Sequence, residues 1–321
     1  MKYGQDGLRT WVKAPANLAL IKYMGKRCFN TNLPINPSLS YTLSDRLAYV
    51  SISPSAASSH RWQPLVAPKF DSITLSAKEK TKLFKHIDRV QRHVGYQGSW
   101  CVASANNFPK SIGIASSSAF FAALTTALLM AISQQGGRPF CWQQAKQLSR
   151  WGSGSACRSF DGPWVAWHQA STQALTCQWR QLKHIVILRS TQAKPVTSTQ
   201  AHRQVKTSPH YHSRFQSARM HYHQARQALA AQDWQALRSI SWQEFEQMHQ
   251  LFETANPTMS YRSPQTMKAL SDLQNIFKQD GPVITMDAGQ AIHCFFLPHQ
   301  TSEQQQLTDW LAQQSLGYYA L

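Results

Sequence analysis

Residues 106–119 read Asn-Asn-Phe-Pro-Lys-Ser-Ile-Gly-Ile-Ala-Ser-Ser-Ser-Ala, and the apolar run 120–131 follows them directly. This pattern predicts a loop that leads into the N-terminus of a buried helix. The first N–H groups of a helix have no intrahelical partner, and the positive end of its dipole favours phosphate. Serine hydroxyls add donors or a magnesium ligand. A serine cluster by itself favours an ordinary N-cap, and the segment matches neither GxxxxGK[ST] nor GxGxxG.

The pattern of apolar residues outside this loop predicts an α+β protein. Period-two and β-branched runs predict strands over residues 47–53, 72–75, 99–103, 184–188, 283–286 and 292–297. Helical spacing predicts helices over 77–93, 116–133, 211–252 with a break near 232–233, 265–277, and the C-terminal segment. We place a domain boundary near residue 185.

Composition narrows the class of protein. The chain has 321 residues, 42% of them hydrophobic, which suits one large or two ordinary domains. It shows no apolar stretch of the ~18–20 residues that span a bilayer, and its start lacks the apolar run of a signal peptide. Its six cysteines have no CxxC pairing, which disfavours zinc and disulfide frameworks. We therefore expect a cytoplasmic protein with reduced thiols and no membrane partner.

Charge is the unusual feature of this composition. The chain carries 33 Lys and Arg against 15 Asp and Glu, a formal charge of +18. Such an excess suits a polyanionic partner, although a generally basic proteome explains it equally well. The basic residues are dispersed and match no nucleic-acid-binding motif, so we expect no nucleic acid partner.

Three further segments contain residues that could bind an anion or take part in catalysis. In residues 14–27, Lys22 and Lys26 would share one face if the segment were a helical turn, although an exposed basic turn is the plainer interpretation. In Gly152–Ser159, glycine and serine precede Arg158, whose guanidinium can grip a carboxylate or phosphate, unless it is a surface arginine after a turn. Asp287 ends the apolar run 283–286, where an acid is costly unless it is used, paired or capping a turn.

These segments together resemble known families. Residues 106–119 resemble the phosphate loop of the GHMP kinase superfamily. Residues 14–27, 33–40, 152–159 and 282–291 resemble the signatures of mevalonate diphosphate decarboxylases, and the similarity runs from about Lys13 to Phe296. The resemblance implies a two-domain α+β GHMP kinase fold, with a ribosomal-protein-S5-like domain over 1–184 and a ferredoxin-like α/β sandwich over 185–321. It also implies a homodimer.

The same resemblance implies an activity and a set of site residues. The activity is the ATP-dependent decarboxylation of mevalonate 5-diphosphate to isopentenyl diphosphate, with Mg²⁺. The expected catalytic residues are Lys22, Arg158 and Asp287. The expected ATP-binding residues are Asn107, Pro109, Gly113, Ala115, Ser116, Ser117 and Ser118, with Mg²⁺ at Ser117. The expected substrate-binding residues are Ala14, Asn17, Tyr23, Lys26, Ser153, Gly154, Ser155, Arg158, Ser198 and Thr199.

The chain also departs from the family pattern. Met24 replaces a tryptophan, Cys28 an aspartate, and Ala201-His202 a Gly-Met pair, while Asp161 introduces an acid near Arg158. The alternatives are a mevalonate 3-kinase, a phosphomevalonate decarboxylase, or a catalytically dead basic binding protein. We interpret the histidine pairs at 210, 212 and 221, 223 as surface residues rather than metal ligands.

Overall fold

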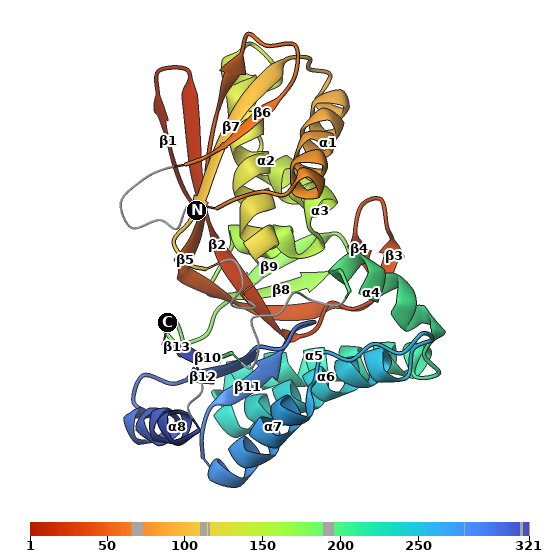
Figure 1. Ribbon diagram of the computed structural model, residues 1–321, viewed down its shortest axis with the longest axis vertical. Helices are drawn as coiled ribbons and strands as arrows, with labels where there is room; N and C mark the ends of the chain where they lie inside the picture. The colour runs from red at the N-terminus through yellow and green to blue at the C-terminus, as the bar shows by residue number, and fades with distance from the viewer. Residues whose placement is uncertain are drawn as a thin grey trace.

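The protein is described by a computed structural model that covers residues 1–65, 73–109, 114, 116–188, 196–278, 280–314 and 317–320. Figure 1 shows two lobes, each built on one sheet, with the N-terminal lobe above and the C-terminal lobe below. The two-domain α+β architecture predicted from the sequence is confirmed by its match to solved structures, which is reported below. The boundary at 184/185 stays a prediction, and it falls within strand β10 (Lys183–Ile187).

The N-terminal lobe is a seven-stranded sheet covered by helices. Its main path runs in the order β1-β2-β5-β7-β6, and β8 and β9 extend the sheet from β5. These strands are β1 (Lys2–Asp6), β2 (Arg9–Ile21), β5 (Ser38–Ser55), β6 (Arg61–Pro64), β7 (Ser99–Asn106), β8 (Trp164–His168) and β9 (Ser171–Leu175). The remaining elements are α1 (Ala77–Val94), α2 (Ser116–Gln134), α3 (Trp142–Gly152), the 3-10 helix η1 (Gly154–Phe160), and the hairpin of β3 (Lys26–Cys28) and β4 (Leu33–Pro34).

Helix α2 forms the centre of this lobe. It is apolar on almost every side, and such a helix is stable in water only when it is buried all round. Among the described residues it alone is long and apolar enough to cross a membrane, but 72% of its most apolar stretch is buried inside the lobe. It packs against β2, β5, α3 and η1, so the serines of its first turn are held at a fixed place in the lobe.

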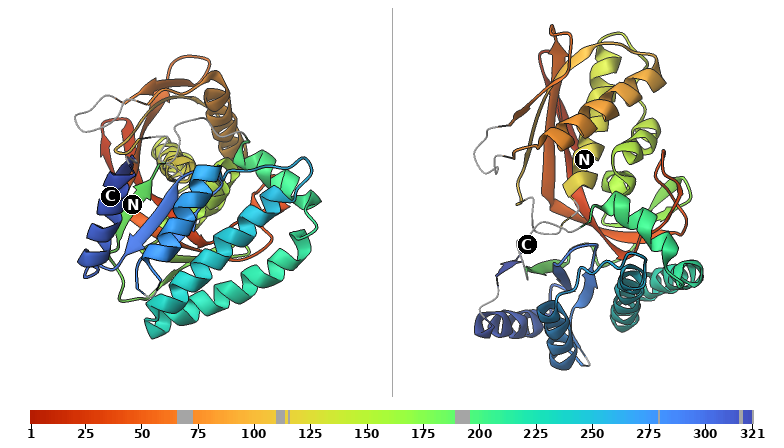
Figure 2. Two further views of the ribbon diagram at one scale, coloured as in Figure 1. Left: turned by 60° about the horizontal axis from the view of Figure 1, so that its bottom comes forward. Right: turned by 45° about the vertical axis from the view of Figure 1, so that its right-hand side comes forward.

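The C-terminal lobe is an antiparallel sheet whose two faces have different neighbours. Its strand order is β11-β12-β10-β13, with β11 (Val283–Met286), β12 (Ile292–Phe296) and β13 (Tyr318–Ala320). Because side chains alternate along a strand, Val283 and Phe295 pack toward the N-terminal lobe, whereas Ile284 and Phe296 pack on the helices. The helices are α4 (Ser198–Gln204), η2 (Val205–Thr207), α5 (Tyr211–Ala231), α6 (Trp234–Glu253), α7 (Pro264–Ile276) and α8 (Thr301–Gln313). Figure 2 shows α7 and α8 on the side of this sheet away from the N-terminal lobe.

Most of the predicted elements are confirmed, and the exceptions have local causes. The break in the long helix is confirmed, because Gln232 adopts a left-handed conformation and the Asp233 side chain caps α6. The strand predicted over 72–75 is wrong for residues 73–75, which form the extended lead into the Ser76 cap of α1, and residue 72 lies outside the described residues. The helical turn considered for Lys22 and Lys26 is also wrong, because β2 continues to Ile21 and Lys26 begins β3.

Candidate active site

An ion pair between the two lobes forms the centre of the site. Lys22 follows β2 of the N-terminal lobe, Asp287 follows β11 of the C-terminal lobe, and their side chains meet with Nζ and Oδ1 2.7 Å apart. The Lys22 side chain is fully buried, whereas 29% of the Asp287 side chain is exposed. Lys22 Nζ also donates to the Ala19 carbonyl at 2.6 Å. Burial lowers the pKa of Lys22, and the Asp287 carboxylate opposes that shift. The pair therefore joins a fully buried cation to a carboxylate that is partly open to solvent.

Arg158 lies beside this pair and connects it to the serines of α2. Its Nε donates to Asn17 Oδ1 at 3.1 Å and its NH1 donates to Ser38 Oγ at 2.7 Å. Asn17 Nδ2 in turn donates to Ser118 Oγ at 3.3 Å. Burial lowers the pKa of Arg158, and the charge of Asp287 acts against this shift. The predicted residues Arg158, Asn17 and Ser118 thus form one buried network that ends at the start of α2.

Tyr23, the residue after Lys22, packs closely against Gly154. A Cβ atom on Gly154 would lie 2.6 Å from the Tyr23 ring, so only glycine allows this approach. The Tyr23 hydroxyl donates to the Asn32 carbonyl at 2.9 Å, and Lys26 Nζ donates to Asn32 Oδ1 at 2.7 Å. Burial, followed by the charges of Lys82 and Arg203, lowers the pKa of Lys26 to about 8. Lys26 is therefore a cation that would gain from a nearby anion.

The predicted phosphate loop is described only in part. Gly113 and Ala115 lie outside the described residues, and Pro109 is half-buried just before the gap. Ser116 begins α2, and Ser117 is exposed with its Oγ 3.2 Å from Ser153 Oγ. These two hydroxyls come from segments that the sequence linked to ATP and to substrate respectively. A serine hydroxyl at a helix N-terminus is a common ligand of the Mg²⁺ that accompanies a bound nucleotide. The Ser117 hydroxyl therefore suits such an ion.

Several predicted site residues lie away from this network or have other partners. Ala14 is fully buried in the core between β2 and the helices. The Asn107 side chain binds main-chain groups, accepting from Leu47 N at 2.7 Å and donating to the Asp45 carbonyl. Ser155 contributes its carbonyl, which accepts from Asn17. Ser198 and Thr199 are exposed in the first turn of α4.

The departures from the family pattern have simple structural outcomes. Asp161 does not approach Arg158, since its carboxylate pairs with Lys146 at 2.7 Å and accepts from Thr172. His202 is buried, accepts from Gly25 N through Nδ1 at 3.0 Å and packs on the Tyr23 ring. Met24 packs in the apolar cluster beneath α4 and α6. His202 therefore packs against Tyr23 and helps to hold its ring in place.

Two residues near this site, Glu244 and Lys82, were not predicted from the sequence. Glu244 of α6 is fully buried and accepts from the Lys22 main-chain N–H at 2.9 Å. Lys82 of α1 packs its ammonium 4.8 Å from the centre of the Phe121 ring, beside the start of α2. It belongs to a groove of about 300 Å³ lined by Lys78, Thr81, Lys82, Lys85, His86, Arg89, Trp151 and Gly152. A cluster of cations on helix α1 could have been noticed in the sequence, but Glu244 looks like any helical glutamate.

The histidine interpretation needs one correction. His221 is buried rather than at the surface, because its Nδ1 lies 2.9 Å from Glu244 Oε1. His212 and His223 are exposed, as expected. No three histidine, cysteine or acidic side chains gather as a metal site in the part of the chain that the structure describes.

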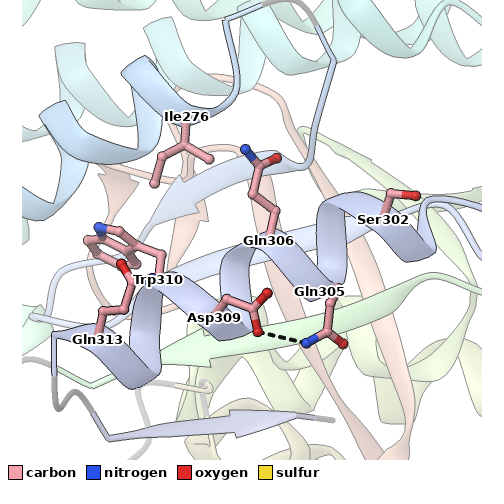
Figure 3. Close-up of a pocket in the computed structure, with 7 residues that line it drawn as sticks. All are labelled: Ile276, Ser302, Gln305, Gln306, Asp309, Trp310 and Gln313. Atoms are coloured by element: carbon pink, nitrogen blue, oxygen red, sulfur yellow. Dashed lines mark hydrogen bonds between the residues drawn. The ribbon is translucent and has the colours of Figure 1, made fainter.

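A more spacious groove lies elsewhere and is chemically unsuited to anions. It has a volume of about 520 Å³ and lies between Ile276 of α7 and one side of α8 (Figure 3). Its described lining carries no cation, and its one carboxylate, Asp309, accepts from Gln305 at 2.7 Å. The described lining of this groove therefore offers no positively charged side chain to an anionic ligand.

Comparisons with known proteins identify the family of this chain. Residues 14–178 match the model of the diphosphomevalonate decarboxylase-like N-terminal domain, and residues 184–315 match that of the mevalonate 5-diphosphate decarboxylase C-terminal domain. The chain belongs to the diphosphomevalonate decarboxylase family. The family assignment from the sequence is thereby confirmed, and it covers both lobes.

Individual members of the family are similar over nearly the whole chain. The crystal structure of a mevalonate diphosphate decarboxylase from Legionella pneumophila is 38% identical, covers 97% of this chain and 100% of its own, and superposes with a TM-score of 0.89. A structure of MDDEF in complex with MVAPP, AMPPCP and magnesium is 25% identical, covers 98% and 97%, and has a TM-score of 0.86. Diphosphomevalonate decarboxylase of Saccharomyces cerevisiae is 28% identical over 91% of this chain and 78% of its own length.

Proposed function

We propose that Asp287, Lys22 and Arg158 carry out the ATP-dependent decarboxylation of mevalonate 5-diphosphate, the reaction after which the family is named. The observation that carries this assignment is the Lys22–Asp287 pair, in which a cation from residues 14–27 meets an acid from residues 282–291 across the two lobes. The products are isopentenyl diphosphate, ADP, phosphate and carbon dioxide.

The chemistry requires a base and a nearby cation. Hydroxide is a poor leaving group, so the tertiary C3 hydroxyl of the substrate must first receive the γ-phosphoryl group of ATP. We assign Asp287 to orient this hydroxyl and take its proton, because the Asp287 carboxylate is the part of the pair that reaches solvent. The buried Lys22 ammonium, 2.7 Å away, fixes the carboxylate and offsets the negative charge that develops on the transferring group.

Carbon–carbon cleavage follows from the departure of phosphate. Loss of the C3 phosphate leaves positive character at C3, and the electrons of the C1–C2 bond move to it as carbon dioxide leaves. We assign Arg158 to the substrate carboxylate, because its guanidinium is buried beside the charge of Asp287 and is held by Asn17 and Ser38. A fixed guanidinium would place the breaking bond relative to C3.

The two phosphate-bearing groups bind to neighbouring parts of this network, which meet where Ser117 Oγ lies 3.2 Å from Ser153 Oγ. We assign Tyr23, Lys26, Ser153 and Ser155, with Gly154, to the substrate diphosphate and its carbon chain. ATP would lie on residues 113–118, at the N-terminal end of α2, where the Ser117 hydroxyl is exposed. Mg²⁺ bound with ATP supplies positive charge to the phosphoryl oxygens. Substrate contacts by Ser198 and Thr199 remain part of the proposal.

One assay tests the proposed reaction. Purified protein, ATP, Mg²⁺ and mevalonate 5-diphosphate are incubated while ADP and carbon dioxide are measured together. Equal release of both supports decarboxylation. ADP without carbon dioxide indicates a 3-kinase, a preference for the monophosphate indicates a phosphomevalonate decarboxylase, and release of neither indicates a binding protein. A cytoplasmic homodimer completes the proposal, and its mass in solution tests the oligomeric state.

A further inference from the structure

A buried cluster of charges lies behind the Lys22–Asp287 pair. Glu244 of α6 is fully buried and uses both carboxylate oxygens. Its Oε2 accepts from Arg214 NH2 of α5 at 2.6 Å and from the main-chain N–H of Lys22 at 2.9 Å. Its Oε1 lies 2.9 Å from Nδ1 of His221, also on α5. The carboxylate that binds the backbone of Lys22 thus comes from α6, and two side chains of α5 hold it in place.

This arrangement fixes Lys22 at every polar group it has. Glu244 accepts from its N–H, Asn36 Nδ2 donates to its carbonyl at 2.9 Å, and the ammonium binds Ala19 and Asp287. Burying a carboxylate is costly, and a core of this kind is often replaced by apolar residues without loss of stability. Stability alone therefore does not account for the buried Glu244 carboxylate, whereas its hydrogen bond to the Lys22 N–H does.

We propose that Glu244 is a positioning residue that holds Lys22, and through Lys22 the carboxylate of Asp287, in the arrangement required for phosphoryl transfer. The inference rests on the proposed function of Lys22 and Asp287. Glu244 is not a ligand of substrate or nucleotide in this proposal, because both of its carboxylate oxygens are bound by Arg214, His221 and the Lys22 N–H. Its negative charge acts on the ammonium in the same direction as Asp287 and helps Lys22 to keep its proton.

The test compares kcat and KM of wild type with those of Glu244→Gln, and uses Glu246→Gln as the matched control. Glu246 lies on the same helix but faces solvent, with 36% of its side chain exposed, and pairs with Arg262. We expect Glu244→Gln to lower kcat by about 10- to 100-fold, the size of a coupling between residues in contact, with both KM values nearly unchanged. Glu246→Gln should retain the wild-type kcat.

A pH profile separates positioning from a general loss of structure. The titratable and charged groups close to Lys22 are Asp287, Glu244, Arg158 and His249, and those that bind Glu244 are Arg214 and His221. Because Glu244→Gln removes a negative neighbour, Lys22 should lose its proton at lower pH, and the alkaline limb of kcat should move to lower pH. A limb that stays where wild type has it would contradict the proposal.

A double-mutant cycle gives the decisive result. If Glu244 acts through Lys22, Glu244→Gln should cost little more in the background of Lys22→Gln, whereas multiplicative losses would overturn the inference. Should Glu244→Gln fail to fold, His221→Gln replaces it. This milder change should still lower kcat several-fold at constant KM, and a wild-type kcat would reject the proposal. Wild-type protein that releases no ADP would instead reject the proposed function itself.

Discussion

Two lysine–aspartate pairs in this chain have the same length and opposite surroundings. Lys22 and Asp287 meet at 2.7 Å between the lobes, and Lys146 and Asp161 meet at 2.7 Å within the N-terminal lobe. In the first pair the lysine is fully buried and the acid is partly open, whereas in the second both side chains are 22% exposed. The contact distance alone therefore says nothing about function.

The difference lies in what surrounds each pair. Glu244 accepts from the main-chain N–H of Lys22, and the Lys22 ammonium lies within electrostatic range of Arg158. Asp161 accepts from Lys146 and from Thr172 and links the end of η1 to α3 and β9. On the proposed function, the first pair presents one carboxylate to the two anionic substrates, whereas the second pair holds a turn. Each prediction below contrasts the two.

The largest contrast is expected between the two aspartates. Asp287→Asn should lower kcat by ~10²–10⁴-fold, the usual contribution of a positioned acid or base, with small changes in KM. Asp161→Asn should keep kcat near the wild-type value. Steady-state kinetics with mevalonate 5-diphosphate measures both, and equal effects of the two substitutions would remove the basis of the comparison.

The two lysines should differ less steeply but in the same direction. Lys22→Gln should reduce kcat by ~10²–10³-fold, because it removes a preorganised cation beside the transferring phosphoryl group. Lys146→Gln should leave kcat unchanged, since Lys146 contacts Asp161 and not the site. Single-turnover ADP formation reports this step directly. A Lys22→Gln variant with normal phosphoryl transfer would show that the buried cation has no part in it.

A third lysine, Lys26, extends the comparison to the pH dependence of kcat/KM. Burial, with Lys82 and Arg203, lowers the pKa of Lys26 to about 8. Below that pH the ammonium is charged and can attract the substrate diphosphate, so kcat/KM should fall as pH rises through about 8. Lys26→Arg, which keeps its charge, should extend activity to higher pH. An alkaline limb that is identical in both proteins would assign it to another group.

The smallest effect concerns stability. The Lys146–Asp161 pair is partly exposed, so its loss in Asp161→Asn should lower the free energy of unfolding by no more than about 1 kcal/mol. A thermal melt at low and at high salt checks this, because screening should shrink the difference. A much larger loss would mean that the turn between η1 and β8 depends on this acid.

The sequence predicts the helices and strands better than it predicts which residues they contact. The apolar helix α2, and the break between α5 and α6 at Gln232, follow from local periodicity and capping, so they could be predicted. The extended lead at 73–75 could not be told from a strand, because a strand also needs a partner. The helical turn at Lys22 failed for the same reason, since pairing with β5 keeps β2 extended.

The site shows the same limit more sharply. The family motifs name Lys22, Arg158 and Asp287, but Asp161 and Asp287 both look like strand-end acids until their partners are known. Glu244 lies 222 residues from Lys22 in the chain, within an ordinary amphipathic helix, so no local pattern indicates that it is buried. Only the packing of α6 against the end of β2 shows this contact.

The measurement that addresses the central claim is the release of ADP and carbon dioxide from ATP and mevalonate 5-diphosphate by wild type, Asp287→Asn and Asp161→Asn. Our account predicts equal amounts of both products from wild type and from Asp161→Asn, with almost none from Asp287→Asn. Wild-type turnover by Asp287→Asn, or ADP without carbon dioxide from the unaltered protein, would contradict it.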